Sequence, residues 1–170
     1  MPKVLILTGP GGSGKSTIAK LLAERCNYEY LDGDREDTEF FPGSDDYQWS
    51  PENSELLQLA HQKILNKTKE FYRKGCNVVV DYIIFGHYLE FLQKFSQEFG
   101  NDLTVRVLMP KLEETIRRDQ ERNIWTTGAD RIKAVTKEFM TIKDKIGAEN
   151  FIDTTGQTPE ETFERYFAEI

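Results

Sequence analysis

Cysteine is scarce in this sequence of 170 residues, which contains only Cys26 and Cys76. Their spacing fits no metal site, so we expect both thiols to be reduced core residues of a cytoplasmic protein. Long hydrophobic runs are also missing, because no stretch approaches the roughly 20 apolar residues that a membrane span needs. The apolar run from Val4 to Leu7 is too short for the core of a signal peptide. We therefore expect no contact with a membrane.

The sequence also contains fewer basic than acidic residues. Lysine and arginine total 22 residues against 29 aspartates and glutamates, which leaves a net charge of −7 and a pI near 5.0. This acidic balance argues against a sequence-independent grip on a nucleic-acid backbone. Aromatic residues make up 12 % of the chain and supply the core-forming side chains that a disordered protein lacks. The length is most economically one compact domain.

Strand-like and helix-like segments alternate along the whole chain. Short apolar or β-branched runs indicate buried strands, and apolar residues at helical spacing indicate helices. The expected strands are Val4–Leu7, Tyr28–Leu31, a run within 76–85, Leu103–Met109 and Phe151–Ile152. The expected helices are Lys15–Cys26, Leu56–Phe71 with a stop at Lys74-Gly75, Tyr88–Phe99, one opened by Pro110, Asp130–Ile146, and one with Pro159 at its first position. This order predicts an α/β sheet with helices on both faces.

A glycine-rich stretch, GPGGSGKST, follows the first expected strand and opens the first expected helix. Its spacing, Gly9-x-x-x-x-Gly14-Lys15-Ser16, is the P-loop pattern, in which backbone N–H groups and a helix N-terminus wrap the phosphates of a nucleotide. Lys15 is expected to reach the β- and γ-phosphates, Ser16 to ligate Mg²⁺, and Thr17 to contact the α-phosphate. The expected nucleotide-binding residues are Gly9, Pro10, Gly11, Gly12, Ser13, Gly14, Lys15, Ser16 and Thr17.

Further segments follow the P-loop in order: LDGD after the second strand, VVVDY at the third, then IRRDQER, Arg131, and IDTTGQTPEET near the end. With the P-loop, they make the chain resemble the small-molecule P-loop kinases, such as gluconate kinase, shikimate kinase and chloramphenicol phosphotransferase. The resemblance implies a three-layer α/β fold with a five-stranded parallel sheet of order 2-3-1-4-5. It also implies one kinase domain over residues 1–170, an acceptor arm at about 32–55, a lid at about 122–131, and ATP and Mg²⁺ as cofactors.

Two acidic residues are candidates for the chemistry. Asp34, at the end of LDGD, would lie across the cleft from the γ-phosphate and accept or orient the proton of an acceptor hydroxyl. A simple turn is the alternative, because Asp-Gly-Asp also favours turns. Asp81 ends the third strand at the edge where open α/β sheets bind ligands. It would hold Mg²⁺ through water, and a strand-end cap is the alternative.

The arginines of IRRDQER are candidates for contacts with ATP. Arg118 and Arg122 lie one helical turn apart, and the resemblance implies that Arg118 stacks on the adenine while Arg122 clamps the transferring phosphate. The resemblance also makes Arg131 a lid contributor to ATP binding, and it brings Thr155, after the last strand, past the adenine edge. The alternative is a solvated helix face on which the arginines of the run pair with neighbouring glutamates.

The acceptor arm departs from the resembled kinases. Between Tyr28 and Glu55 there are ten acidic residues and a single base, Arg35. Gluconate kinases place a His soon after the Asp-x-Asp segment, but here Arg35-Glu36-Asp37 follows Asp32-Gly33-Asp34. After the third strand the chain also lacks the Arg with which nucleotide monophosphate kinases hold the acceptor phosphate. An anionic acceptor would be repelled here, whereas the aromatic residues of the arm suit a ring or a sugar face. These aromatic residues are Phe40, Phe41, Tyr47 and Trp49. A solvated acidic loop that faces away from the cleft is the alternative.

These features predict an ATP-dependent phosphotransferase that moves the γ-phosphate to a hydroxyl of a small, neutral or cationic acceptor. Lys15, Asp34 and Arg122 are the expected catalytic residues, with Ser16 and Asp81 at the metal. The alternatives are a nucleoside, nucleotide or gluconate-type kinase and, from another class, a non-catalytic ATP-binding regulatory protein. We expect a cytoplasmic monomer or homodimer without a nucleic-acid polymer or a membrane as partner.

Overall fold

The computed structural model describes residues 1–40, 54–84, 87–123 and 126–170. Five parallel strands form one sheet in the order β2-β3-β1-β4-β5. The strands are β1 (Val4–Thr8), β2 (Tyr28–Asp32), β3 (Asn77–Asp81), β4 (Leu103–Leu108) and β5 (Phe151–Ile152). The predicted α/β class and strand order are confirmed.

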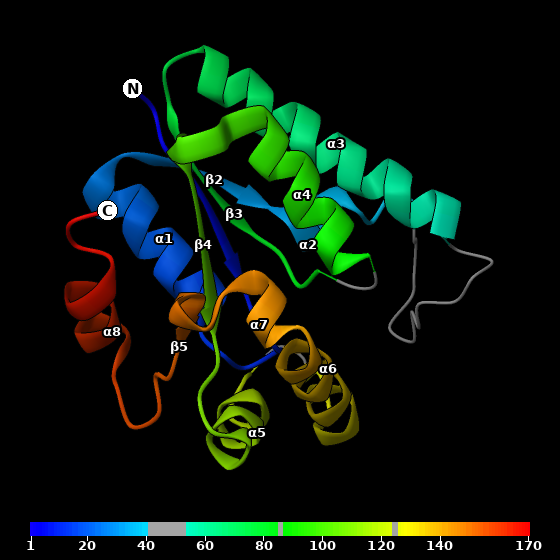
Figure 1. Cartoon of the computed structure of the whole chain (residues 1–170). Coiled ribbons are helices and arrows are strands. Elements are labelled where there is room, and N and C mark those ends of the chain that lie inside the picture. The colour runs from blue at the N-terminus through cyan, green and yellow to red at the C-terminus, as the bar shows by residue number, and fades with distance from the viewer. Residues whose placement is uncertain (41–53, 85–86, 124–125) are drawn as a thin grey trace.

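Helices cover both faces of the sheet, as Figure 1 shows. One face carries α1 (Lys15–Cys26) and α8 (Pro159–Tyr166), and the other carries α3 (Ser54–Arg73) and α4 (Tyr88–Phe99). The α8 helix begins with Pro159 and a complete capping box, in which the side chains of Thr158 and Glu161 bond each other's backbone N–H groups. The expected start of this helix is confirmed.

The remaining elements lie beside the carboxyl ends of the strands (Figure 1). They are α2 (Gly33–Glu36), α5 (Leu112–Gln120), α6 (Ala129–Thr141) and α7 (Lys143–Ile146). Two short 3-10 turns, Gly100–Asp102 and Ala148–Asn150, precede β4 and β5. Because the P-loop also follows the carboxyl end of β1, these elements surround the edge at which open parallel sheets bind their ligands.

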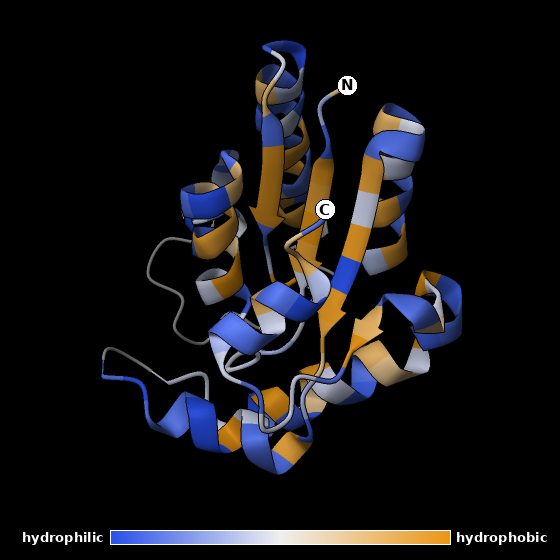
Figure 2. Cartoon of the chain, turned by 90° about the vertical axis from the view of Figure 1, so that its left-hand side faces the viewer, coloured by the Kyte–Doolittle hydropathy of each residue, from blue (hydrophilic) through white to orange (hydrophobic). Residues whose placement is uncertain are grey.

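The strand side chains alternate between two separate hydrophobic clusters. Val4 and Ile6 pack with the aromatic residues of α4, and Leu5 and Leu7 pack with α1 and α8. All four side chains are fully buried, which explains why the segment Val4–Leu7 is apolar throughout. Figure 2 shows hydrophobic residues along most of the central strands. Among the described residues, no helix is both long enough and apolar enough to cross a membrane.

The single helix expected over Asp130–Ile146 is wrong, because α6 and α7 are separated at Ile142. The Ile142 backbone leaves the helical region, with φ −108° and ψ 7°, and its N–H is shared between the carbonyl oxygens of Glu138 and Phe139. The Thr141 hydroxyl donates to the same Glu138 oxygen at 2.6 Å. A side-chain hydroxyl that competes for a helix carbonyl in this way favours an interruption.

Two smaller expectations are also corrected. Pro110 lies before α5 and does not open it, because Lys111 is extended (φ −53°, ψ 146°) and the helix begins at Leu112. Cys26 and Cys76 are free thiols, as expected, but both are only partly buried. Cys26 is the last residue of α1 and Cys76 lies in the turn before β3, so neither reaches the centre of a cluster.

The core also contains a histidine. His61, on α3, is 4 % exposed, and its ring lies edge-on to the rings of Phe91 and Tyr82, with centroid distances of 4.8 and 5.7 Å. Its Nε2 atom has no hydrogen-bond partner in the described part of the chain. The pKa of His61 is lowered to about 4, mainly by burial, with contributions in the same direction from His87 and Lys94 and an opposing one from Glu90. His61 is therefore neutral in the folded protein.

We expect the His61→Phe substitution to make folding stability less dependent on pH. An unfolded histidine titrates near its usual pKa of 6.5, so between about pH 6.5 and 4 the unfolded chain binds more protons than the folded chain. Stability therefore falls as the pH falls through this window, by about 2 kcal/mol between pH 7 and 5 from this one group. Urea unfolding should be measured at pH 7 and at pH 5. Between these pH values the free energy of unfolding should fall by about 2 kcal/mol more for the wild type than for His61→Phe. The partly exposed His87, replaced by Gln, is the control, and equal losses in all three proteins would contradict the assignment.

Candidate active site

The P-loop has a backbone that only glycine allows at several positions. Gly9, Gly12 and Gly14 have φ values of +138°, +81° and +98°. A Cβ on Gly9 would collide with the carbonyl oxygen of Leu108, and a Cβ on Gly12 would collide with that of Thr115. Gly14 begins α1 without a side-chain cap, so the first N–H groups of the helix remain available to an anion.

Lys15 lies at the start of α1 and is 5 % exposed. Its Nζ donates to the carbonyl oxygen of Pro10 at 3.1 Å, within the same loop. Burial lowers the pKa of Lys15, and the carboxylates of Asp81 and Asp34 oppose this shift, whereas the charge of Arg122 adds to it. Four of the predicted site residues therefore lie within electrostatic reach of one another.

Asp81 ends β3 and is 3 % exposed. Its Oδ2 accepts a hydrogen bond from the hydroxyl of Tyr30 at 3.1 Å, and Oδ1 has no partner in the described residues. Burial and the Asp81 carboxylate raise the pKa of the Tyr30 hydroxyl, and a side-chain contact with Ser16 opposes this shift, so the hydroxyl also lies close to Ser16. A buried carboxylate oxygen without a partner, near a serine hydroxyl, fits the hard oxygen ligands that Mg²⁺ prefers. In the same described residues, no group of three or more His, Cys, Asp or Glu side chains is arranged to hold a metal by itself.

Asp34 lies in the first turn of α2, directly after β2. The start of this helix is fixed by the Asp32 side chain, which accepts from the Arg35 N–H at 3.1 Å. Asp34 is open to the cleft, but the surrounding protein desolvates its carboxyl group, and this burial raises its pKa to about 7. The Lys15 charge opposes the shift and the neighbouring carboxylates add to it, while the water that still reaches Asp34 limits it.

Two further aspartates line up beside Asp34. Asp37 accepts from the Tyr82 hydroxyl at 3.1 Å, and burial, partly offset by that hydrogen bond, raises the pKa of Asp37 to about 6. Burial also raises the pKa of Asp32. Gly33 allows the turn to lie against the ring of Tyr82, since a Cβ there would come within 2.6 Å of it. The acceptor side of the cleft is thus a cluster of partly desolvated carboxyl groups.

Two further acids of the arm, Glu36 and Glu39, are already neutralised. Glu36 pairs with Lys67 at 2.6 Å and with Lys63 at 3.3 Å, and Glu39 pairs with Lys63 at 2.8 Å. These pairs connect the arm to α3. The alternative of a solvated acidic segment thus fits these two glutamates, and the cleft charge comes from the aspartates. Most of the arm, including Phe41, Tyr47 and Trp49, lies outside the described residues.

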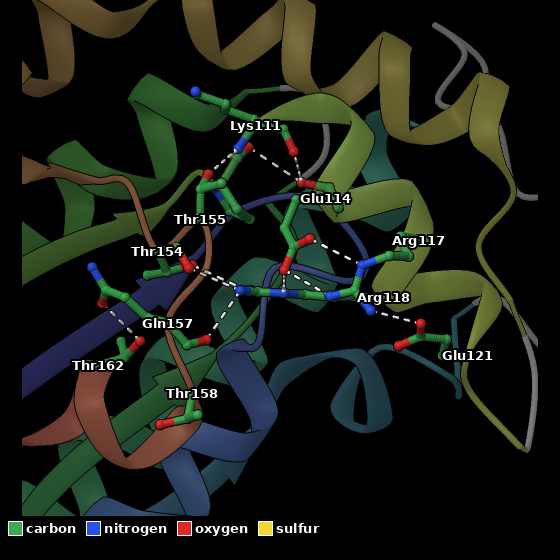
Figure 3. Close-up of polar contacts among 12 residues, drawn as sticks. Lys111, Glu114, Arg117, Arg118, Glu121, Thr154, Thr155, Gln157, Thr158 and Thr162 are labelled. Atoms are coloured by element: carbon green, nitrogen blue, oxygen red, sulfur yellow. Dashed lines mark hydrogen bonds and ion pairs between the residues drawn. The ribbon is translucent and has the colours of Figure 1, made fainter.

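Arg118 joins α5 to the loop after β5, as Figure 3 shows. Its guanidinium donates to the carbonyl oxygens of Thr154 at 2.8 Å and Gln157 at 3.2 Å, and its Nε donates to Glu114 at 2.8 Å. These bonds hold the guanidinium in one orientation. Arg117, one position earlier, follows the alternative of a solvated helix face, since it pairs with Glu114 and with Glu121.

Arg122 follows α5 and pairs with Asp119 at 3.6 Å. Asp119 is 1 % exposed, and its carboxylate accepts from the N–H groups of Thr127 at 2.9 Å and Gly128 at 3.1 Å. Thr127 packs so closely over Gly11 that a Cβ there would collide with it, and the Thr127 hydroxyl is buried without a partner in the described residues. The segment at Thr127 and Gly128, part of the expected lid, is therefore held to α5 by Asp119 and lies against the P-loop at Gly11.

Arg131 and Thr155 lie differently from the other predicted nucleotide residues. The charge of Arg131 acts on Asp37 and on Tyr88, at the acceptor side. The Thr155 hydroxyl is bonded within its own loop to Asp153 and accepts from the Lys111 N–H at 2.8 Å. These contacts give both residues other partners, and their proposed roles toward ATP stay predictions. Two residues of the expected lid, Ile124 and Trp125, lie outside the described residues.

The P-loop, α5 and the loop after β5 enclose a cavity of about 520 Å³. Its lining includes Gly12, Ser13, Gly14, Thr17, Arg117, Arg118, Arg122, Thr154, Gly156 and Gln157. This volume is typical of a site for a small molecule or a nucleotide. The cavity runs from the P-loop to the segment that Arg118 holds, so the residues predicted to bind the phosphates and the base line one cavity.

Comparisons with known proteins agree with this arrangement. Residues 5–133 match the AAA_18 family, described as an AAA domain. The chain belongs to this family of P-loop domains. A protein of Thermococcus gammatolerans named "Putative adenylate kinase" is 31 % identical over 163 residues, with 93 % of this chain and 80 % of that protein covered. Shikimate kinase 1 of Pectobacterium atrosepticum is 28 % identical over 169 residues, with 93 % and 88 % covered.

A solved structure extends the likeness to the fold. The crystal structure of a gluconokinase from Sinorhizobium meliloti superposes with a TM-score of 0.66 at 17 % identity, with 94 % of this chain and 86 % of that chain covered. Identity at this level shows a shared fold only. Together with the sequence relatives, it makes the chain a member of the P-loop kinases, as the motifs predicted.

We expect Arg118→Ala to weaken ADP binding about tenfold, because a charged, fixed hydrogen-bonding group at the base subsite is lost. The neighbouring Arg117→Ala removes only exposed ion pairs, which contribute little, and should change ADP affinity less than twofold. Isothermal titration calorimetry with ADP measures both variants. Equal affinities for wild type and Arg118→Ala would contradict the assigned base subsite.

Proposed function

We propose that the protein is an ATP-dependent phosphotransferase that moves the γ-phosphate of ATP to a hydroxyl group of a small, neutral or cationic acceptor. The main support for this proposal is a cluster of charged residues at the carboxyl edge of the sheet. In this cluster Lys15 of the P-loop lies within electrostatic reach of Asp34, Asp81 and Arg122. Those are the charge types that phosphoryl transfer needs: cations for the phosphates, an acid for Mg²⁺ and a proton acceptor.

Each residue has a defined task in this proposal. The P-loop N–H groups and Lys15 bind the phosphates, and Arg118 holds the base. Asp34 accepts the proton of the acceptor hydroxyl as its oxygen attacks the γ-phosphorus, the bond to the β-phosphate oxygen breaks, and ADP leaves. Arg122 clamps the phosphoryl group in transit, where its planar fork matches the oxygens. Asp119 is suited to orient Arg122, since it pairs with it.

Mg²⁺ would be held by Ser16 and, through water, by Asp81, whose Oδ1 has no partner among the described residues. When bound, Mg²⁺ neutralises charge on the phosphate oxygens. The buried Asp81 supplies the fixed negative charge that this requires, next to the hydroxyl of Ser16.

The acceptor class is supported by the charges of the cleft. Burial raises the pKa values of Asp32, Asp34 and Asp37, and neighbouring carboxylates add to each shift: Asp81 acts on Asp32 and Asp34, and Asp32 acts on Asp34 and Asp37. Such shifts are expected where negative charge is in excess. An anionic acceptor would add to that excess, whereas a neutral hydroxyl or an ammonium group would relieve it. Sugars, aminosugars, nucleosides and hydroxylated antibiotics have this chemistry.

A nucleotide acceptor is the second candidate. The relative from Thermococcus gammatolerans, which carries the adenylate kinase name, spans most of the chain, and the Arg131 charge reaches Asp37 on the acceptor side. One guanidinium against three carboxyl groups still leaves the described acceptor side negative, and for this reason we place the nucleotide second.

A screen for acceptor-dependent ADP release tests the function. We expect saturable ADP release with at least one sugar, aminosugar, nucleoside or antibiotic after the acceptor-free ATPase rate is subtracted. Shikimate, gluconate and AMP should each have a kcat/KM at least about tenfold lower, because their charge meets repulsion. Lys15→Ala is the inactive control. A micromolar KM for one of these anions would overturn the acceptor class, and ATP binding without turnover on any acceptor would favour a regulatory protein.

The role of Asp34 predicts the pH dependence of kcat/KM. A general base must be ionised, and burial raises the pKa of Asp34 to about 7. The value of kcat/KM should therefore fall as the pH drops below about 7, approaching tenfold per pH unit. Asp34→Asn should lower kcat/KM by roughly 10²- to 10⁴-fold and remove this dependence. Glu39→Gln, on the same arm but paired with Lys63, should keep the wild-type profile. An unchanged acid limb in Asp34→Asn would exclude Asp34 as the base.

A further inference from the structure

Tyr30 is a residue for which the P-loop pattern provides no role. It lies in the middle of β2, and its side chain packs against the cluster on the α1 face of the sheet. From there the hydroxyl reaches two residues from different elements, Asp81 at the end of β3 and Ser16 in the first turn of α1. These are the two residues assigned to Mg²⁺.

The direction of the hydrogen bonds gives Tyr30 a specific effect. Its phenol proton goes to Oδ2 of the Asp81 carboxylate, at 3.1 Å. Because the phenol gives its only proton to Asp81, its oxygen is an acceptor toward the nearby Ser16 hydroxyl. A Ser16 proton directed to Tyr30 would leave the Ser16 lone pairs available to a cation. On Asp81, Oδ1 has no partner among the described residues, and the residue is 3 % exposed. The two oxygens that could ligate a cation, Oδ1 of Asp81 and the Ser16 hydroxyl oxygen, therefore belong to side chains that Tyr30 contacts.

We propose that Tyr30 is a positioning residue for the Mg²⁺ site, whose hydroxyl fixes the Ser16 oxygen and the Asp81 carboxylate for the same ion. This inference rests on the proposed use of Mg²⁺ and ATP. Groups that orient metal ligands without touching the metal commonly change metal affinity about 10- to 100-fold when they are removed. The competing view is that Tyr30 only packs, as its contact with the hydrophobic cluster allows.

Tyr28 provides a matched control. It lies two positions earlier on β2, on the same face of the sheet, and is 4 % exposed. Its hydroxyl is buried without a hydrogen-bond partner in the described chain. Tyr28→Phe and Tyr30→Phe each remove one oxygen from the same strand, and only the second change removes bonds to Asp81 and Ser16.

The test measures ATP binding by calorimetry, in EDTA and in a titration of Mg²⁺. We expect Tyr30→Phe to bind ATP in EDTA within about twofold of wild type, and to need about tenfold more Mg²⁺ for half of the metal-dependent gain in affinity. Tyr28→Phe should match wild type in both measurements.

The other outcomes are distinguishable. Equal Mg²⁺ requirements for Tyr30→Phe and wild type would overturn the positioning role. Equal losses of affinity in EDTA and in Mg²⁺ would assign Tyr30 to packing and likewise overturn it. If ATP binding to the wild type does not respond to Mg²⁺ at all, or ATP does not bind, the proposed function itself fails along with this inference.

Discussion

The close approach of backbone to backbone around the P-loop is the constraint on which the rest of the site depends. Gly9 leaves no room for a side chain beside Leu108, Gly12 none beside Thr115, and Gly11 none beside Thr127. Strand β4, helix α5 and Thr127, which precedes α6, therefore touch the loop directly. The loop carries bare N–H groups because the carbonyl groups of Leu108 and Thr115 and the Thr127 side chain occupy the space that its own side chains would otherwise fill.

The charges of the cleft follow from this packing. Lys15 is buried at the centre, which lowers its pKa, and acidic side chains from β2, α2 and β3 gather around it. One lysine does not balance Asp34, Asp81 and their neighbours, and so the pKa of Asp34 rises toward neutrality. In the proposed function, the same imbalance would favour Mg²⁺ near Asp81 and disfavour a second anion on the acceptor side. The proposed metal site, proton acceptor and acceptor class would thus have a common electrostatic origin.

Sequence reasoning was most successful where one local signal decides the structure. The alternation of apolar strands and helical spacing predicted the α/β class, whereas the strand order came from the resemblance to the P-loop kinases; α1 and α4 begin and end where expected. It was weaker where competition between side chains decides, as at Ile142, where the Thr141 hydroxyl takes a helix carbonyl. The pairing of Glu36 with Lys63 and Lys67 was also out of reach, because the partners lie on another element. Arm acidity alone did not distinguish these glutamates from the aspartates of the cleft.

The residues that the sequence did not reveal share one property, since each acts through a contact that crosses between elements. Tyr30 looks like a second aromatic residue of an alternating strand, and only the neighbouring β3 and α1 show that its hydroxyl, unlike that of Tyr28, is used. Asp119 looks like one more charge in IRRDQER, although spacing of three from Arg122 hinted at a pair.

Helix α5 makes several such contacts between elements. Within nine residues it presents a carbonyl to Gly12, Arg118 to the loop after β5, and Asp119 to the N–H groups at the start of α6. These three contacts join the P-loop, the loop after β5 and the residues just before α6 to one helix. A displacement of α5 relative to the P-loop would therefore break contacts at both ends of the cavity at once. This explains why a short, highly charged helix carries a buried aspartate.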